Sequence, residues 1–478
     1  MLTDGRARVG GAVARLLPGA LTGAVAISWL WRHEIVIKCG LLTSYAAVLL
    51  AASGTSAALG KWMWLGDTVT ASWIKTTIAI YCGLQVAALL WRVFLAASYR
   101  PWPAAVDSDL PTVTVVLPAY NEGSAVGESI HSILASDYPR QKLELVCVDD
   151  GSVDDTWAHM TAAAAGYDQA RVRLVRLPHN QGKRRALLAG IRMSRAAVIV
   201  TIDSDSTIDP DTLRHLISPL VAESEIATVA GNVTVKNVQA GLIPRMLRAS
   251  FVQAFDFARC AQSQFGAVFC TPGALSAHRR SCLDQILPEW SRQHFLGRPA
   301  TIGEDRALTT LHLRGGYRSV FQANAMVRTD VPVHWRQLVR MFLRWERSNV
   351  RENLAMARFF YKPWRRRHWL FANLEYLMHL CAMLVTPLFM AAMLIAVLLH
   401  PSWLAMMLAW VIVLSLLMQA YYWRRHRDSG WIYGVLYGLV WSLALWWLPS
   451  WGVLTARNGS WMTRDKPPHS PEPGGARG

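Results

Sequence analysis

Long uncharged apolar stretches at both ends of the chain constrain the fold more than any other feature. Residues 39–60 carry no charge and are long enough to cross the roughly 30 Å hydrocarbon core of a bilayer. Residues 76–98 are similar, and their internal Arg92 can extend toward the interface. Further apolar stretches follow the polar middle of the chain at 371–399, 402–423 and 431–455. The sequence therefore predicts α-helical transmembrane segments on both sides of a soluble domain.

Basic residues gather beside these stretches and account for much of the formal net charge of +17. Between residues 336 and 367 there are ten Arg or Lys, opposed only by Glu346 and Glu352. The positive-inside rule then places residues 99–370 and the 424–430 loop in the cytosol. Because the basic residues lie beside predicted spans, we expect the lipid bilayer, and no nucleic acid, as their partner. The seven cysteines show no paired metal spacing and are expected to be reduced.

The same pattern predicts how the chain is divided. In order, we expect a cytosolic N-terminal or interfacial segment at 1–38, two transmembrane helices at 39–98, a soluble domain at 99–335, amphipathic interface helices at 336–369, a transmembrane or re-entrant region at 370–464 and a disordered tail at 465–478. The stretch 431–455 leaves two topologies open. A full crossing places the C-terminus outside, whereas re-entry near Pro449 and Gly452 keeps it inside.

Strand-like and helix-like patterns alternate in the soluble domain. The expected strands are 112–117, 143–148, 172–177, 196–202 and 226–229, and the helices between them are 124–136, 156–165, 182–194 and 211–222. This alternation predicts an α/β fold with an open, Rossmann-like parallel sheet wrapped by helices. Polar motifs follow the first strands, namely "PAYNE", "DDGS", "NQGKRR" and "DSDS". Ligands bind at the carboxyl ends of such strands, so we expect one crevice there.

The "DSDS" motif is the expected metal site. Asp203 and Asp205 flank one residue, so both carboxylates can approach one cation. Hard oxygen ligands of this kind suit Mg²⁺ or Mn²⁺ held mainly by a diphosphate. The alternative is a solvated turn with two capping aspartates. The position after a buried strand, beside other polar strand ends, favours the metal site.

Three other motifs carry the remaining candidate chemistry. In "DDGS", Asp149 is placed to accept a hydrogen bond from a base N–H or a ribose hydroxyl, or else to cap a turn. Lys183 and the arginines after it begin a helix, where the helix dipole disfavours cations unless a phosphate lies nearby. In "GED", Asp305 is a general-base candidate if burial and a like charge raise its pKa. The alternative for "GED" is a helix N-terminus with favourable acids.

Together, "PAYNE", "VDDGS", "NQGKRRAL", "DSDS", "FLGRPATIGEDRALT" and "FLRWERSNVRE" resemble the family 2 processive membrane glycosyltransferases. The resemblance is strongest to hyaluronan synthases and to NodC-type chitin-oligosaccharide synthases. It continues through "RCAQSQFGAVFC" and the C-terminal "SWMTR" and covers roughly residues 76–464 in the expected order. An ordered set of motifs is far more specific than any one of them. It implies a GT-A-like glycosyltransferase domain.

The resemblance also implies residue roles on the donor side. Tyr120 would stack on uracil, while Glu122, Asp149 and Asp150 would contact the uridine. Lys183 and Arg184 would approach the nucleotide phosphates. Asp203 and Asp205 would hold the sugar nucleotide and the metal, and Asp305, beside Glu304, would be the catalytic base.

On the acceptor side, Arg344 and Trp345 match the Gln-x-x-Arg-Trp motif, with the tryptophan facing the acceptor sugar and the arginine near the diphosphate. Met341 replaces the expected Gln, which puts polymer identity in doubt. Leu338, Met341, Phe342 and Trp345 form one helical stripe, and Arg340, Arg344, Arg347 and Arg351 form another. Such an amphipathic helix can also lie on the inner leaflet. Trp461, Thr463 and Arg464 complete the expected substrate-binding set.

The reaction implied is inverting transfer: an acceptor hydroxyl attacks the anomeric carbon of a UDP-α-sugar and gives a β-linkage. The metal and the cations stabilise the departing diphosphate. We therefore expect a multi-pass plasma-membrane enzyme that extends a polysaccharide acceptor and exports it. Hyaluronan would need UDP-GlcNAc and UDP-glucuronate, whereas chitin-like or poly-N-acetylglucosamine products need UDP-GlcNAc alone. Alternatives are a non-processive transferase acting on a lipid phosphate and a catalytically inactive scaffold or transporter.

Overall fold

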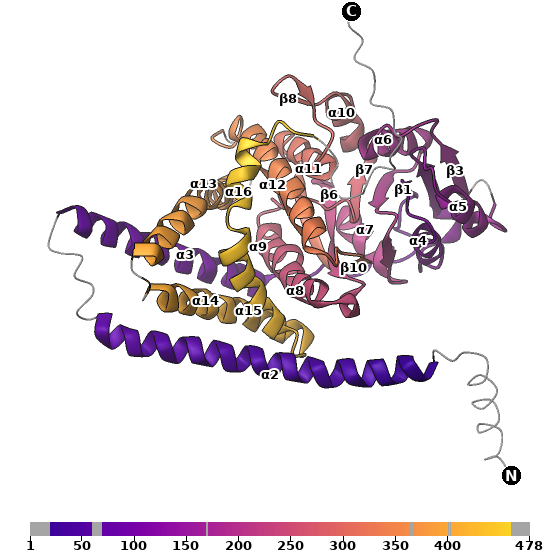
Figure 1. Cartoon of the computed structure of the whole chain (residues 1–478). Coiled ribbons are helices and arrows are strands. Elements are labelled where there is room, and N and C mark those ends of the chain that lie inside the picture. The colour runs from indigo at the N-terminus through magenta and orange to yellow at the C-terminus, as the bar shows by residue number, and fades with distance from the viewer. Residues whose placement is uncertain are drawn as a thin grey trace, which may run out of the picture.

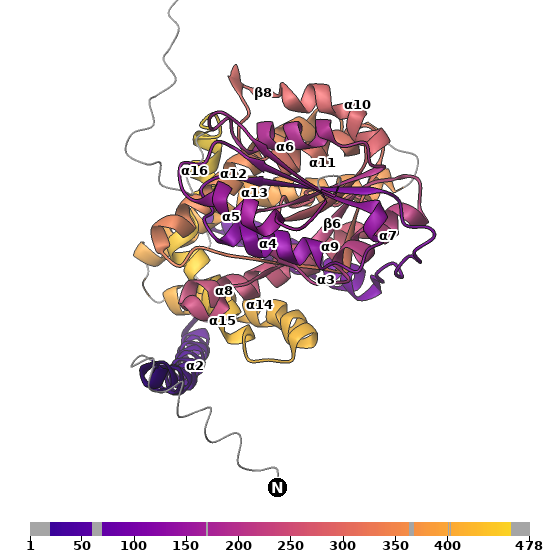
Figure 2. The same cartoon turned by 90° about the vertical axis from the view of Figure 1, so that its right-hand side faces the viewer.

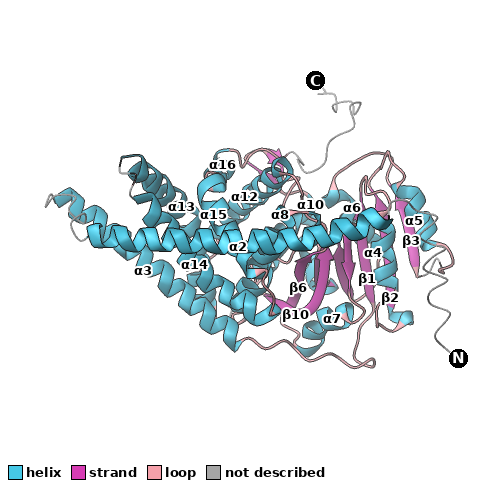
Figure 3. Ribbon diagram, turned by 60° about the horizontal axis from the view of Figure 1, so that its bottom comes forward, coloured by secondary structure: helices cyan, strands magenta, loops and turns pink. Residues whose placement is uncertain are grey.

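The computed structural model describes residues 20–59, 69–168, 171–362, 368–399, 401 and 403–459 of the 478-residue chain. Figure 1 shows long apolar helices gathered beside an α/β domain, with helix α2 running under both. The same arrangement is seen from below in Figure 3. The motifs at Trp461, Thr463 and Arg464 lie outside the described residues.

The apolar helices come from both ends of the chain. They are α2 (Ala20–Leu59), α3 (Val69–Ser98), α13 (Trp369–Leu399), α14 (Trp403–His426), α15 (Trp431–Val440), the π-helix η4 (Trp441–Leu445) and α16 (Leu448–Leu454). Tyr45 of α2 packs with Ile412 of α14 and Ile432 of α15, and its hydroxyl donates to the Ile432 carbonyl at 3.2 Å. The N-terminal and C-terminal helices therefore form one bundle.

Within the described residues, two helical stretches are long and apolar enough to cross a membrane, Glu34–Ser53 and Leu404–His426. The segment Trp431–Leu445 meets α16 at a bend of 48°, which fits either a broken span or a re-entrant loop. The described apolar stretches of α3 and α13, Gly83–Ser98 and Trp369–Val385, are too short to count as candidate spans. A multi-pass arrangement with the domain in the cytosol stays a prediction.

The α/β domain contains a mixed eight-stranded sheet of order β3-β2-β1-β4-β7-β6-β10-β5. Its strands are β1 (Val113–Ala119), β2 (Leu143–Asp149), β3 (Val172–Arg176), β4 (Val198–Ile202), β5 (Ser206–Ile208), β6 (Ile226–Val235), β7 (Leu275–Arg279) and β10 (Arg318–Thr329). Strands β1 to β4 pair in parallel, and β7 inserts antiparallel between β4 and β6. The expected α/β fold is confirmed, with its first strands close to the predicted ranges. The sheet is mixed rather than purely parallel, because β5 and β7 run antiparallel to their neighbours.

Helices cover both faces of the sheet, as Figure 2 shows. One side carries α4 (Ala125–Leu134), α5 (Thr156–Ala164) and α7 (Thr212–Ala222), and the other carries α6 (Lys183–Met193), α10 (Arg280–Ser291) and α11 (Glu304–Arg314). Alternate residues of β1 serve the two layers: Val115 packs with Ile130 of α4, whereas Val116 packs with Leu187 of α6. This two-sided burial explains why the strand is apolar throughout.

Two groups of helices join the domain to the apolar bundle. The first is the continuous run of α8 (Leu242–Phe251), the π-helix η3 (Val252–Phe257) and α9 (Ala258–Ser263); the second is α12 (Trp335–Ala357). Asp256 of η3 accepts hydrogen bonds from Tyr421 at 2.8 Å and from Arg425 at 2.9 and 3.1 Å, both on α14. A small hairpin, β8 (His294–Phe295) and β9 (Arg298–Pro299), lies between α10 and α11 in sequence.

The close packing of α6 on the sheet gives a stability prediction. A Cβ on Gly190 would lie 2.4 Å from Cγ1 of Val116, whereas a Cβ on Gly127 of α4 would meet Ala163 at an ordinary 4.0 Å. We expect Gly190→Ala to destabilise the protein by about 1–3 kcal/mol through overpacking. The matched control Gly127→Ala should be neutral or slightly stabilising, because alanine favours a helix. Thermal unfolding of the detergent-solubilised chain measures both; equal midpoints would contradict this packing.

Candidate functional site

The carboxyl ends of the strands bring the acidic motifs together around one lysine. Lys183 begins α6, and its ammonium contacts Oδ1 of Asp203 and lies 3.1 Å from Oε1 of Glu304. Asp203 follows β4, and Glu304 begins α11, so one cation links three segments that are distant in sequence. The two carboxylates offset the unfavourable interaction of this ammonium with the N-terminus of α6.

The loop before β7 closes this cluster from another side. A Cβ on Gly273 would lie 2.6 Å from the Lys183 ammonium and 3.6 Å from Oδ1 of Asp203, so a larger residue there would displace the lysine side chain. The Gly273 N–H donates to Oδ2 of Asp305 at 3.1 Å, and the Cys270 thiol lies 3.8 Å from the same oxygen. The "CTPGA" loop therefore connects the base candidate to the aspartate turn.

The pKa values of the adjacent acids Glu304 and Asp305 are shifted in opposite directions. Burial raises the pKa of the Asp305 carboxyl, and the Glu304 charge raises it further. Burial also disfavours the charge of Glu304, but the Lys183 ammonium, with help from the Arg344 charge, holds the pKa of Glu304 below its usual range. Divergent pKa values of two neighbouring acids are typical of assigned acid and base roles. The geometry thus favours Asp305 as the base and Glu304 as an anchor for Lys183.

The "PAYNE" and "DDGS" turns lie against one another. Asn121 has a left-handed backbone with φ of 52°, its N–H donates to the Ser152 hydroxyl at 3.0 Å, and its side-chain oxygen accepts from the Val153 N–H at 3.0 Å. Asp149 is fully buried, accepts from the Ser152 N–H at 2.9 Å and pairs with Arg176 at 3.2 Å. A hollow of about 370 Å³ opens beside Ser152 and Arg176.

Glu122 connects this side to the "DSDS" turn. The Ser204 hydroxyl donates to Oε1 of Glu122 at 2.7 Å, and the Ser129 hydroxyl donates to the Ser204 carbonyl at 2.8 Å. Asp205 accepts from the Thr329 hydroxyl at 3.2 Å, at the end of β10. Tyr120 is half-buried at the end of the same first-strand turn. The structure therefore brings Tyr120, Glu122, Asp149, Asp203 and Asp205 to one edge of the sheet.

The side chains of Asp150 and Arg184 bond to other parts of the protein. The Asp150 carboxylate is buried and accepts the N–H groups of Gln181 and Gly182 at 2.8 and 2.7 Å, so it tethers the loop before Lys183. Arg184 points to α10, where it donates to the Trp290 carbonyl at 2.5 Å and lies over the Trp290 ring. The geometry does not favour Arg184 as a phosphate ligand, because its guanidinium is buried in this contact.

Helix α12 carries the Arg-Trp motif and packs beside α11, which begins with Glu304 and Asp305. Trp345 is half-buried against the rings of Phe251, Phe255 and Phe342, with centroid distances of 6.1, 6.2 and 5.6 Å. Met341 is only 5% exposed and packs in the domain core. Met341, at the position where the resemblance expects Gln, thus faces apolar side chains. Trp345 still packs against Phe251, Phe255 and Phe342.

Two members of the arginine stripe of α12 contact other parts of the protein, and the interfacial placement of the helix stays a prediction. Arg347 donates to the Thr455 hydroxyl at 3.0 Å, and Arg351 donates to the carbonyls of Ala456 and Asn458 at 2.7 and 3.0 Å. Both guanidinium groups are buried. These contacts tie the chain after α16 to α12, so this part of the stripe binds protein.

Three contributors to the site were not expected from the sequence: Gly273, Arg176 and Thr329. Gly273 lies in "CTPGA", which is not among the motifs singled out from the sequence. Arg176 ends an expected strand, but cations at strand ends are common. Thr329 ends β10, a strand that was not expected at all, so no sequence signal pointed to it.

Comparison with known proteins agrees with this geometry. The family model described as "Glycosyltransferase like family 2" matches residues 111–348. An N-acetylglucosaminyltransferase of Rhizobium meliloti is 31% identical over 421 residues, 86% of this chain and 95% of that protein. One from Azorhizobium caulinodans is 36% identical over 260 residues, 53% of this chain and 65% of that protein. A mannosyltransferase from Pyrobaculum calidifontis, solved with GDP-Man and Mn²⁺, has a TM-score of 0.54 at 25% identity and covers 77% of this chain and 97% of its own.

The fold is GT-A-like, and the ends of its strands bring several acids and a lysine together. This is the architecture of a nucleotide-sugar glycosyltransferase. The chain belongs to glycosyltransferase family 2. The expected enzyme class is thereby confirmed, while the individual residue roles stay predictions.

The Asp150 tether predicts a pH dependence of donor binding. Burial raises the pKa of Asp150 to about 6, against an ordinary value of 3.8. Above pH 6 the carboxylate accepts both loop N–H groups; below it, the protonated group loses acceptor capacity and the loop before Lys183 loosens. We expect the affinity for a nucleotide-sugar donor, assayed with UDP-GlcNAc, to fall as the pH drops through about 6. In Asp150→Asn the affinity should be weak and this step absent. Titration calorimetry from pH 5 to 8 measures both; an unchanged step in the variant would exclude Asp150 as its source.

Proposed function

We propose that this protein is a membrane-embedded, inverting β-glycosyltransferase that transfers N-acetylglucosamine from UDP-GlcNAc to a growing saccharide and exports the product. The observation that carries the proposal is the convergence of Lys183 with Asp203 and Glu304, one residue before the half-buried Asp305. The relatives named N-acetylglucosaminyltransferases support the choice of sugar.

In the proposed reaction, Asp305 takes the proton of the attacking acceptor hydroxyl. Its raised pKa makes it a stronger base than an exposed aspartate, and its hydrogen bond from Gly273 fixes its orientation. Lys183 would bind the diphosphate and stabilise the negative charge that develops as it leaves. Arg344 of α12 lies close enough to Glu304 to lower the pKa of that carboxyl, and it would help to stabilise the charge of the leaving diphosphate.

The residues present also fit a divalent metal. Asp203 and Asp205 offer hard oxygen ligands, and Asp203 is partly exposed at the crevice. Within the described residues no group of three His, Cys, Asp or Glu side chains could hold an ion unaided. Mg²⁺ or Mn²⁺ would therefore take its other ligands from a diphosphate and water, as Mg²⁺ commonly does. The Mn²⁺ bound in the Pyrobaculum calidifontis enzyme supports this assignment. When bound, the ion would neutralise charge on the diphosphate.

The acceptor side supports extension of a saccharide at the membrane. Trp345 and the neighbouring Phe255 offer half-buried aromatic faces, which suit stacking on sugar rings. Helix α12 lies between the catalytic turn and the bent helix pair of the bundle, so an acceptor at Trp345 would be close to the apolar helices. Positive charge beside the apolar stretches supports a plasma-membrane location with the domain in the cytosol.

A second candidate product is hyaluronan, which requires UDP-glucuronate as a second donor. The resemblance of "FLGRPATIGEDRALT" and "SWMTR" to hyaluronan synthases favours it, whereas the relatives named above favour GlcNAc alone. We place the GlcNAc polymer first for that reason.

Donor use is the test of the function. We expect the purified chain with Mg²⁺ or Mn²⁺ to incorporate radiolabelled GlcNAc from UDP-GlcNAc alone, and EDTA to abolish incorporation. Incorporation that requires both UDP-GlcNAc and UDP-glucuronate would select hyaluronan instead. No turnover of any UDP-sugar would sink the enzyme proposal in favour of a scaffold or transporter.

The base assignment predicts a separation of binding from chemistry. Asp305→Asn should lower transfer by roughly 10²–10⁴-fold while UDP still binds, because the amide keeps the shape but cannot take a proton. Transfer kinetics and UDP calorimetry on the same preparation measure the two effects. Glu304→Gln is the matched neighbour: it should weaken UDP binding by releasing Lys183. Retained activity in Asp305→Asn would remove it as the base.

A further inference from the structure

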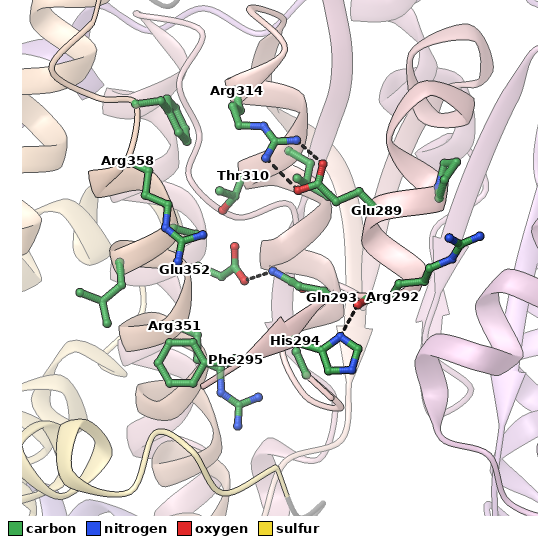
Figure 4. Close-up of a pocket in the computed structure, with 16 residues that line it drawn as sticks. Glu289, Arg292, Gln293, His294, Phe295, Thr310, Arg314, Arg351, Glu352 and Arg358 are labelled. Carbon is green, nitrogen blue, oxygen red and sulfur yellow. Dashed lines mark hydrogen bonds and ion pairs between the residues drawn. The ribbon is translucent and has the colours of Figure 1, made fainter. Parts of the chain in front are cut away.

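A second cavity lies outside the crevice, between α10, α11, α12 and the β8–β9 hairpin. Its volume is about 580 Å³, within the roughly 300–1,000 Å³ usual for small-molecule sites. Figure 4 shows side chains from all four elements around it. It contains none of the residues assigned above to the donor or the metal, so its polar lining has no role in the proposed reaction.

The lining mixes opposite charges with aromatic and amide groups. Arg314 pairs with Glu289, which neutralises both. Gln293 donates to Oε1 of Glu352 at 2.9 Å, and Arg358, which follows α12, points toward that carboxylate in Figure 4. Phe295 lies under the guanidinium of Arg351 at 5.6 Å. The cavity is therefore neither a purely basic nor a purely apolar one.

Two buried groups in this lining have unused hydrogen-bonding capacity. Glu352 is 4% exposed; the Thr310 hydroxyl lies near it, yet within the described chain its Oε2 has no partner of hydrogen-bond geometry. Arg351 is 5% exposed, and its Nη1 likewise has no such partner among the described residues. Unsatisfied buried groups of this kind are costly and point to a missing partner.

The Arg351 guanidinium is directed to the carbonyls of Ala456 and Asn458, so the partner to be identified is that of Glu352. This partner must donate to a carboxylate. A phosphate is repelled by Glu352, and an apolar ligand offers it no donor. A sugar ring donates through its hydroxyl groups, and an acetamido group adds an N–H donor and a carbonyl acceptor. Its apolar face can also stack on an aromatic ring such as Phe295.

The cavity is connected to the crevice through direct contacts. Gln293 also accepts from Arg184 at 3.0 Å, and Arg184 follows Lys183 in the chain. The Trp290 indole N–H donates to the Glu304 carbonyl at 2.8 Å. A ligand that moves Gln293 or Glu352 would therefore disturb groups that adjoin both Lys183 and Glu304.

We propose that this cavity is a second saccharide-binding site, distinct from the catalytic crevice, for a short N-acetylglucosamine oligosaccharide. The choice of sugar rests on the proposed function, whereas the choice of a saccharide rests on the lining. Such a site holds an acceptor or product segment beside α12 without occupying the donor pocket.

The test measures binding of N,N′-diacetylchitobiose to the detergent-solubilised chain by calorimetry and ligand-observed NMR. Binding should persist in Asp305→Asn and in the presence of saturating UDP. It should weaken about tenfold or more in Glu352→Gln and in Arg358→Ala, because each removes a charged hydrogen-bonding group. Arg358 is exposed, so that variant should fold even if Glu352→Gln does not. Arg298→Ala, on the same hairpin but outside the lining, is the matched control and should bind normally.

Unchanged affinity in both variants, or loss of binding in Trp345→Ala instead, would place the saccharide in the crevice and overturn the proposal. Displacement of chitobiose by inorganic phosphate or by vesicles of anionic lipid, at a site lost in Arg358→Ala, would replace the saccharide with an anion. Failure of the GlcNAc transfer assay with chitobiose binding intact would contradict the proposed function and leave this site standing.

Discussion

The contact of Lys183 with Asp203 and Glu304 is the interaction on which the site depends. Without it, three carboxylates would converge at the sheet edge with no opposing charge, and mutual repulsion and burial would raise their pKa values. The lysine keeps Glu304 charged, and the charge of Glu304 in turn raises the pKa of Asp305. One ammonium thus sets the different behaviour of two adjacent acids.

Helix α12 is held on two sides at points where only glycine fits. A Cβ on Gly303, which has a left-handed φ of 77°, would meet the Ser348 hydroxyl at 1.9 Å. A Cβ on Gly452 of α16 would meet Cβ of Glu346 at 2.7 Å. The turn of Glu304 and Asp305 and the bent apolar helix α16 therefore both lie against α12 within two residues of one another, with Trp345 next to both.

The sequence predicted the strands whose burial is local and missed those that depend on distant partners. Runs such as "TVTVVL" are apolar and β-branched, so β1 needed no other information. Strand β10 contains Gln322, whose amide bonds to the backbone N–H and carbonyl of Trp102 at 3.1 and 2.9 Å across more than 200 positions. Arg184 shows the same limit: a cation at a helix start suggests phosphate, and only the fold reveals its contact with Trp290. Its expected role at the phosphates stays a prediction. The acidic motifs were predictable because a parallel sheet places its strand ends at one edge whatever the loops do.

The two glycine contacts also bear on how extension could be tied to the membrane. Arg351 fixes the chain after α16 to α12. Thr301, two residues before Gly303, donates from its hydroxyl to the Gly459 carbonyl in the same segment. At Gly452 the backbone of α16 lies so close to Glu346 that a Cβ would not fit between the two helices. Ser348 of α12 lies equally close to Gly303, which begins the turn that carries Glu304 and Asp305. The helix that presents Trp345 therefore contacts both the bent helix pair and the turn of Glu304 and Asp305, the acids proposed for catalysis.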